Sequence, residues 1–112
     1  MDEQEFRRRA ESSLEELKQR LLDAEGSASA DFEVEEQDGA IHISFDDPPA
    51  RFVISPNAPV RQIWISALAT SYKLDWSDTQ QDFVLPKTGE TLKPLVARLI
   101  NQQLGSEAVK FE

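Results

Sequence analysis

The sequence predicts an α+β domain, a two-layer α/β sandwich in which two helices pack on one face of an antiparallel sheet of about six strands. Amphipathic segments with apolar residues at helical spacing lie at the two ends of the chain. Between them, short segments alternate apolar and polar residues and are separated by short turns. Short turns require antiparallel pairing, and two helices on one face leave the other face of the sheet in water. We expect residues 1–112 to form this one domain.

The first helix is predicted over residues 2–25. Asp2 and Glu5 have the spacing of a capping box, with Asp in place of Ser or Thr. Gly26 supplies a stop. The predicted core stripe of this helix consists of Phe6, Ala10, Leu14, Leu17 and Leu21.

Three strands are expected next. Residues 31–35 alternate and are followed by an Asp-Gly hairpin signal at residues 37–39. Ile41, Ile43 and Phe45 face inward on the returning strand. The third strand is predicted over residues 51–55, and residues 55–59, with two prolines, are predicted to form a loop.

Residues 61–66 form the most informative predicted strand. Ile63 and Ile65 point to the core, whereas Gln62, Trp64 and Ser66 point to the opposite face. Because the helices cover the first face, Trp64 is expected on the open face of the sheet. Its indole is either covered by neighbouring polar side chains or kept for a partner, and alternation alone does not decide between these two interpretations.

The remaining elements complete the sandwich. A turn over residues 67–71 leads to a strand whose residues Tyr72, Leu74 and Trp76 share one face, and a short sixth strand follows at residues 83–85. The second helix begins near Thr88 or Thr91, and Pro94 favours the later start because proline is harmless only in a first turn. Gly105 ends this helix, and residues 108–111 are expected to lie against the core between the helices.

The charge and the residue types limit the possible functions. A net charge of −9 and a pI of about 4.6 argue against nucleic-acid binding and fit binding of cations or of a basic partner, although acidity also simply maintains solubility. Without cysteine and with one histidine, His42, the chain has no thiolate ligand or cysteine nucleophile. Any metal must be held mainly by carboxylate and carbonyl oxygens, which suit hard ions such as Mg²⁺, Ca²⁺, Mn²⁺ and iron.

Motifs for catalysis and targeting are absent from the sequence. It contains no GxxxxGK[ST], GxGxxG or GxSxG, so an enzyme with a conventional cleft is not supported. No apolar run approaches the ~18 residues that span a bilayer, and the acidic start lacks the apolar region of a signal peptide. We therefore expect a soluble, cytoplasmic protein without a membrane partner.

The stretch from Asn57 to Ser66 resembles the frataxin family, and more closely its bacterial branch. Pro59, Gln62 and Trp64 match the family's loop and strand, whereas Ser55 and Asn57 depart from its Asn and Gln. Further matches, in chain order, are Glu5-Phe6 with Ala10, Tyr72 with Asp75-Trp76, Gly89-Glu90-Thr91-Leu92 and Gln102-Gln103-Leu104-Gly105. The resemblance therefore extends over nearly the whole chain.

This resemblance implies the same helix–sheet–helix fold and a role as an iron-binding accessory protein of iron–sulfur cluster assembly. Fe²⁺ or Fe³⁺ would be bound weakly by an acidic ridge on the first helix and strand. The partners would be the cysteine desulfurase and the iron–sulfur scaffold protein, and the chain would be a monomer without iron. The implied metal-binding residues are Asp23, Glu25, Asp31 and Glu33, and the implied partner-binding residues are Glu16, Asn57, Gln62 and Trp64.

Two other functions stay open at this point. Lys18, Gln19, Leu22, Ser27 and Ser29 occupy positions that are often acidic in the family, so the ridge is thinned and its iron sites should be weaker or fewer. A metal-independent acidic module that regulates the desulfurase is therefore one alternative. A weak ferroxidase is the other, although no histidine-supported di-iron constellation is present in the sequence.

Overall fold

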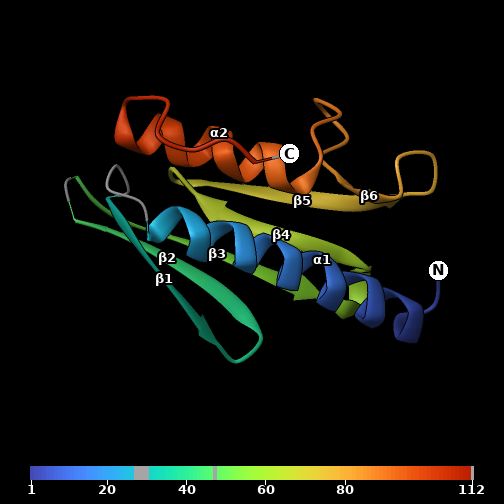
Figure 1. Ribbon diagram of the computed structural model, residues 1–112. Coiled ribbons are helices and arrows are strands. Elements are labelled where there is room, and N and C mark those ends of the chain that lie inside the picture. Colours follow the sequence, from blue (N-terminus) through green and yellow to red (C-terminus); the bar gives the residue numbers. More distant parts are fainter. Residues whose placement is uncertain (27–30, 47, 112) are drawn as a thin grey trace.

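The computed structural model describes residues 1–26, 31–46 and 48–111 as two helices and a six-stranded antiparallel sheet. The elements are α1 (Glu3–Glu25), β1 (Phe32–Gln37), β2 (Ala40–Asp46), β3 (Pro49–Asn57), the 3₁₀ turn η1 (Ala58–Val60), β4 (Gln62–Ala67), β5 (Thr70–Ser77), β6 (Asp82–Val84) and α2 (Leu92–Leu104). The strands follow one another in the sheet in chain order, and both helices lie on the same side of it (Figure 1). The predicted α+β sandwich is confirmed.

The core lies between the helices and one face of the sheet. All five residues of the predicted α1 stripe are buried, and Leu22, which lies off the stripe, is 39% exposed. On the sheet, Ile41, Ile43, Ile63 and Ile65 are almost completely buried, as their alternation predicts. The helix-facing layer of the sheet is thus apolar, and the opposite face holds the polar side chains.

Helix α1 begins at the predicted cap. The carboxylate of Asp2 accepts a hydrogen bond from the backbone N–H of Glu5 at 2.7 Å. Glu5 does not complete a reciprocal capping box, because its carboxylate pairs with Arg9 one turn later at 3.2 Å. Gly26 caps the other end with an ordinary right-handed conformation, φ −75°.

The predicted loop over residues 55–59 was wrong in its first half. β3 continues to Asn57, and Pro56 pairs with Ile63 of β4. On the other side of β3, the pairing with β2 does not extend beyond Ile54. Pro56 therefore has a neighbouring strand on one side only, where a residue without an N–H is tolerated. The 3₁₀ turn η1 takes the rest of the predicted loop.

The predicted turn over residues 67–71 was too long. Ala67 pairs with Thr70, so only Leu68 and Ala69 connect β4 to β5. Both have positive φ, 53° and 60°, the conformation of a type I′ turn, in which asparagine and glycine are preferred. Leucine and alanine are not typical of such a turn, so the sequence gives no sign of it. Elsewhere β1 runs two residues past its predicted end at Glu35, and β6 is shifted one residue towards the N-terminus.

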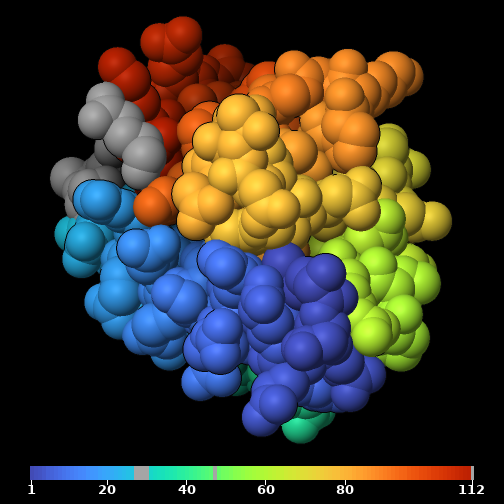
Figure 2. Space-filling model, turned by 90° about the vertical axis from the view of Figure 1, so that its right-hand side faces the viewer, coloured from blue at the N-terminus to red at the C-terminus, as the bar shows by residue number. Residues whose placement is uncertain are grey.

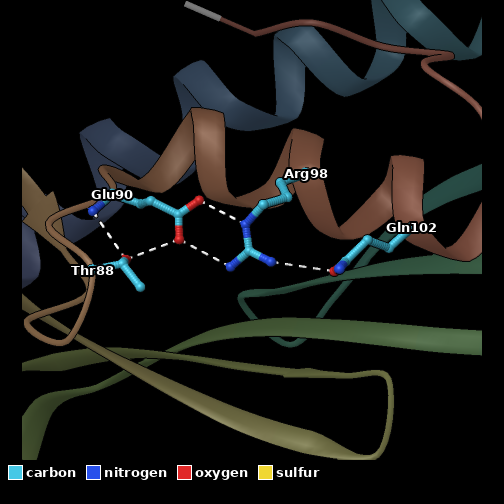
Figure 3. A network of polar contacts seen from close by, with 4 residues as sticks. All are labelled: Thr88, Glu90, Arg98 and Gln102. Atoms are coloured by element: carbon cyan, nitrogen blue, oxygen red, sulfur yellow. Dashed lines mark hydrogen bonds and ion pairs between the residues drawn. The ribbon is translucent and has the colours of Figure 1, made fainter.

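Helix α2 begins at the later of the two predicted starts, with Thr91 as its N-cap. A polar network fixes the segment before it (Figure 3). Arg98 donates two hydrogen bonds to the Glu90 carboxylate, at 2.7 and 2.9 Å, and the Thr88 hydroxyl donates a third at 2.8 Å. Arg98 also contacts the side-chain oxygen of Gln102 at 3.3 Å. These bonds tie the connection from β6 to the middle of α2.

The C-terminal tail lies against the helices, as expected. Phe111 is only 7% exposed, and Ala108 to Phe111 lie beside residues of both α1 and α2. The side chain of Asn101 anchors this tail. Its Oδ1 accepts the backbone N–H groups of Ala108 and Val109, and its Nδ2 donates to the backbone carbonyl of Val109. Within the described ranges, no helix is both long and apolar enough to cross a membrane.

Candidate metal-binding and partner-binding surfaces

The predicted metal-binding residues lie on two adjoining segments, the last turn of α1 and the start of β1. Asp23 and Glu25 belong to that last turn, and Asp31 and Glu33 begin the segment that forms β1. Residues 27–30, which connect them, lie outside the described ranges, and so do the predicted thinning positions Ser27 and Ser29. The last turn of α1 contains no basic residue, so the partial negative charge of the helix C-terminus adds to that of the carboxylates. Arg20 and Lys110 line a hollow beside Asp23, so cations of the chain also lie near this acidic end.

The four carboxylates are not equivalent. Asp23, Asp31 and Glu33 are exposed, and none forms an ion pair with a cation in the described part of the chain. Glu25 is half-buried, and its carboxylate accepts a hydrogen bond from the backbone N–H of Val34. Val34 lies on β1, the edge strand of the sheet. Glu25 therefore already serves the fold by satisfying a backbone donor on that edge.

The middle of α1 is electrostatically different from its end. The ammonium of Lys18 lies 3.2 Å from the carboxylates of both Glu15 and Glu36, so it joins α1 to β1. Hydrogen bonds from Gln19 and Lys18 lower the pKa of Glu15, and those to Glu36 and Glu15 raise the pKa of Lys18. Glu15 lies three residues before Lys18 on the same helix, whereas the contact with Glu36 depends on how α1 packs beside β1 and is not visible in the sequence.

Across the described ranges, no three carboxylate or imidazole side chains gather closely enough to hold a metal ion. The acidic end offers separate carboxylate oxygens, the ligand type that hard cations prefer. Glu16 does not belong to this end. It lies on α1 with its carboxylate 3.8 Å from the Lys93 ammonium of α2, and Asp23 is two helical turns, roughly 10 Å, further along α1.

The second candidate surface is the open face of the sheet around Trp64. The indole N–H of Trp64 donates to the side-chain oxygen of Gln62 at 2.8 Å, and the Gln62 amide donates to Asp75 at 3.0 Å. The Lys73 ammonium lies 4.8 Å from the centre of the Trp64 ring, within the range of a cation–π contact. The indole is therefore half-buried and held in one orientation, with part of its surface in water.

Asn57 lies on the same side of the molecule, at the end of β3. It pairs with Gln62, and Gln62 pairs with Asp75, so these three residues form one row across β3, β4 and β5. Trp64 and Lys73 belong to the next row along the same strands. The structure thus brings the predicted residues Asn57, Gln62 and Trp64 together.

Lys73 and Asp75 were not among the predicted partner-binding residues. Their alternation with Leu74 places them on the open face, but assigning them opposite Trp64 and Gln62 requires the register of β4 and β5. That register follows from a two-residue turn at Leu68 and Ala69, which the sequence does not reveal. A correct turn length would have identified both residues.

The chain matches the family model of a frataxin-like domain over residues 1–106. Two similar curated proteins, both named iron-sulfur cluster assembly protein CyaY, come from Stutzerimonas stutzeri and Janthinobacterium sp. The first is 26% identical over 96 residues, 86% of each chain, and the second is 23% identical over 109 residues, 97% of this chain and 96% of the relative. The solved structure of the frataxin from Psychromonas ingrahamii, a CyaY-family protein, superposes with a TM-score of 0.73 at 15% identity, covering 98% of this chain and 100% of that one.

Proposed function

Because this chain belongs to the frataxin-like family, in its bacterial CyaY branch, we propose that it serves iron–sulfur cluster assembly as an iron-binding accessory protein. The observation that carries this proposal is the match of nearly the whole chain to the family, including relatives named for that process. The proposed site of action is the bacterial cytoplasm. The proposed partners are a cysteine desulfurase and an iron–sulfur scaffold protein.

The proposed iron-binding surface consists of Asp23, Asp31 and Glu33, with Glu25 as an additional ligand. The first three are exposed acids at an end of the molecule where the helix terminus adds negative charge. Carboxylate oxygens in an exposed, loosely arranged set favour weak and exchangeable binding of a hard cation. Such binding suits a protein that delivers iron as cargo and does not retain it.

The same acidic residues, together with Glu16, are proposed to contact a basic patch of the desulfurase. Exposed charges mainly raise the association rate and make binding sensitive to salt. The surface around Trp64 is proposed as a second contact, for the scaffold protein. A half-exposed indole held by Gln62 loses little conformational freedom on binding, which is typical of a residue that contributes strongly to an interface.

Iron titration followed by NMR of the apo protein tests the metal-binding part of the proposal. We expect broadening at residues 23–33, and a several-fold weaker effect in Glu33→Gln. Glu11→Gln is the matched control, because Glu11 is an exposed acid on α1 that forms no ion pair with a described cation. Broadening confined to other regions, or equal losses in both variants, would contradict the proposed site.

The second candidate function is a metal-independent module that regulates the desulfurase. It is favoured by the engagement of Glu25 with Val34 and by the neutralising contacts of Lys18 with Glu15 and Glu36. Charge reversal, Glu33→Lys, separates the two functions. Loss of desulfurase binding with unchanged iron affinity would favour the module, whereas loss of both supports the iron-binding accessory protein.

A pull-down against the host's desulfurase and scaffold protein, at two salt concentrations, tests the partners. Desulfurase binding should weaken steeply with salt because the proposed contact is between exposed charges. Trp64→Ala should weaken scaffold binding about tenfold or more, as for a central aromatic anchor. Thr70→Ala, at the far exposed end of β5, is the control and should bind as the wild type does.

A further inference from the structure

A cleft of about 430 Å³ opens beside Glu16, the one lining residue that it shares with the proposed surfaces. It lies between the first half of α1, the turn between β5 and β6, and the first turn of α2. Figure 2 looks onto this side of the molecule, where that turn, in yellow to orange, lies against the first half of α1, in blue. The cleft is mostly polar, and its character is set by three cationic side chains, Arg8, Arg9 and Lys93.

These three cations have donors that the described residues leave unused. Arg8 forms no ion pair or hydrogen bond within the described part of the chain. The Nε of Arg9 pairs with Glu5 at 3.2 Å, and the central carbon of its guanidinium lies over the Trp76 ring, 4.4 Å from the ring centre. This contact restrains the guanidinium while its terminal N–H groups remain available.

Lys93 is the most enclosed of the three, because its side chain is only 19% exposed. Its one ion pair, with Glu16, is long at 3.8 Å, and the Glu16 side chain is 66% exposed. That distance exceeds the length of a charge-assisted hydrogen bond, so the ammonium is not satisfied by this contact. A partly enclosed cation with a loose partner is a favourable point for an anionic ligand.

Two hydroxyl groups extend the set of donors. Ser12 and Ser13 follow Arg8 and Arg9 by four residues, so each lies on the same side of α1 as its arginine, one turn further along. Both line the cleft, and neither hydroxyl forms a hydrogen bond within the described ranges. Arginine, lysine and serine donors together match the several acceptor oxygens of a tetrahedral oxyanion.

Two carboxylates in the cleft oppose anion binding less than their number suggests. Glu16 is largely exposed, so it can turn into solvent when a ligand takes the Lys93 ammonium. Asp82 accepts the N–H of Phe83 at 2.7 Å, which partly satisfies its charge, and burial raises the pKa of this carboxyl. The cleft is lined by three cations and two acids, and Glu5 pairs with one edge of Arg9, so the local charge is close to balanced in a chain of net charge −9.

We propose that the cleft formed by Arg8, Arg9, Ser12, Ser13 and Lys93 binds a small tetrahedral oxyanion of the phosphate class. The anion would lie between α1 and Lys93, with the guanidinium of Arg9 held in place by Trp76. The same donors recognise the free ion and the terminal group of a small phosphorylated metabolite. This inference does not depend on the proposed iron-binding function.

Titration of the full chain with inorganic phosphate, at constant ionic strength, tests the proposal. Emission of Trp76 reports on the cleft in a Trp64→Phe background, in which the other tryptophan is removed. We expect saturable binding at millimolar phosphate or below, and a loss of about tenfold or more in Arg8→Gln and in Lys93→Gln, as for a lost charged contact. A parallel titration with glycerol 3-phosphate distinguishes a phosphorylated metabolite from the free ion as the preferred form.

Arg7→Gln is the matched control, because Arg7 precedes Arg8 on the same helix but does not line the cleft. It removes the same charge and should leave phosphate binding unchanged. The proposal is overturned if the wild type shows no saturable response up to 20 mM phosphate. It is equally overturned if Arg7→Gln weakens the response as much as Arg8→Gln, because the effect would then be one of net charge. Circular dichroism of each variant confirms that its fold is intact.

Discussion

Replacement of Glu25 separates its contribution to the fold from its proposed contribution to iron binding. The carboxylate accepts the backbone N–H of Val34 on the edge strand β1. A hydrogen bond to a charged group contributes about 1.5–3 kcal/mol, and water can partly replace this one because both residues are only half-buried. We therefore expect Glu25→Ala to lower the free energy of unfolding by about 1 kcal/mol, or roughly 5 °C in Tm.

Glu25→Gln keeps an oxygen that accepts the Val34 N–H but removes the negative charge. Both substitutions remove a carboxylate from the C-terminal turn of a helix, where the helix dipole disfavours it. The comparison of Gln with Ala therefore cancels this effect and isolates the hydrogen bond. We expect Glu25→Gln to lose less than about 0.5 kcal/mol of stability while weakening iron binding as much as Glu25→Ala does.

Urea unfolding followed by circular dichroism measures the stability difference, and iron titration by NMR measures affinity. Asp23→Ala is the control for stability, because Asp23 is an exposed acid in the same helical turn and should change the free energy of unfolding by less than about 0.5 kcal/mol. Equal destabilisation by Gln and Ala would refute the assigned role of the hydrogen bond. An unchanged iron affinity in both variants would remove Glu25 from the proposed metal-binding residues.

Two further predictions concern stability alone. Hydrogen bonds from Arg98 lower the pKa of Glu90. The stability that this ion pair contributes is therefore fully present above the ordinary pKa of 4.5 and is lost as the pH falls through the lowered pKa. Glu90→Gln should therefore reduce the free energy of unfolding at pH 7 by about 1 kcal/mol and make stability fall less steeply below pH 5. Urea unfolding at a series of pH values measures both effects. An unchanged dependence of stability on pH below pH 5 would contradict the assigned role of Glu90. Replacing Leu68-Ala69 by Asn-Gly should raise the free energy of unfolding by about 1 kcal/mol, because both positions have positive φ, and a loss of stability would show that the Leu68 side chain matters more than the turn.

Periodicity predicted the fold because burial on one side dominates each element. The α1 stripe from Phe6 to Leu21 and the alternation of Ile63 and Ile65 were sufficient to assign one helix and one central strand correctly. Pro94 selected the correct start of α2 for a steric reason that acts within a single turn. Features determined by local backbone or by one-sided burial could thus be predicted from the sequence.

Features that depend on pairing between distant segments could not be predicted from the sequence. The register of β4 and β5 follows from the unusual turn at Leu68, so the positions of Lys73 and Asp75 beside Trp64 and Gln62 were inaccessible from residue types. The engagement of Glu25 with Val34 likewise requires the path of the chain between α1 and β1. The acidic residues are visible in the sequence, but the hydrogen bond that already engages Glu25 is not.

The distribution of charge along α1 gives an independent reason to connect its acidic end with cations. Asp2, Glu3 and Glu5 lie at the N-terminus, where the helix dipole favours negative charge. Asp23 and Glu25 lie at the opposite end, where the dipole favours positive charge, and the last turn has no basic residue to offset them. Those two acids therefore destabilise the isolated helix. A cation bound there would reverse the unfavourable contact, so the arrangement that weakens α1 supports the proposed binding of iron or of a basic partner surface.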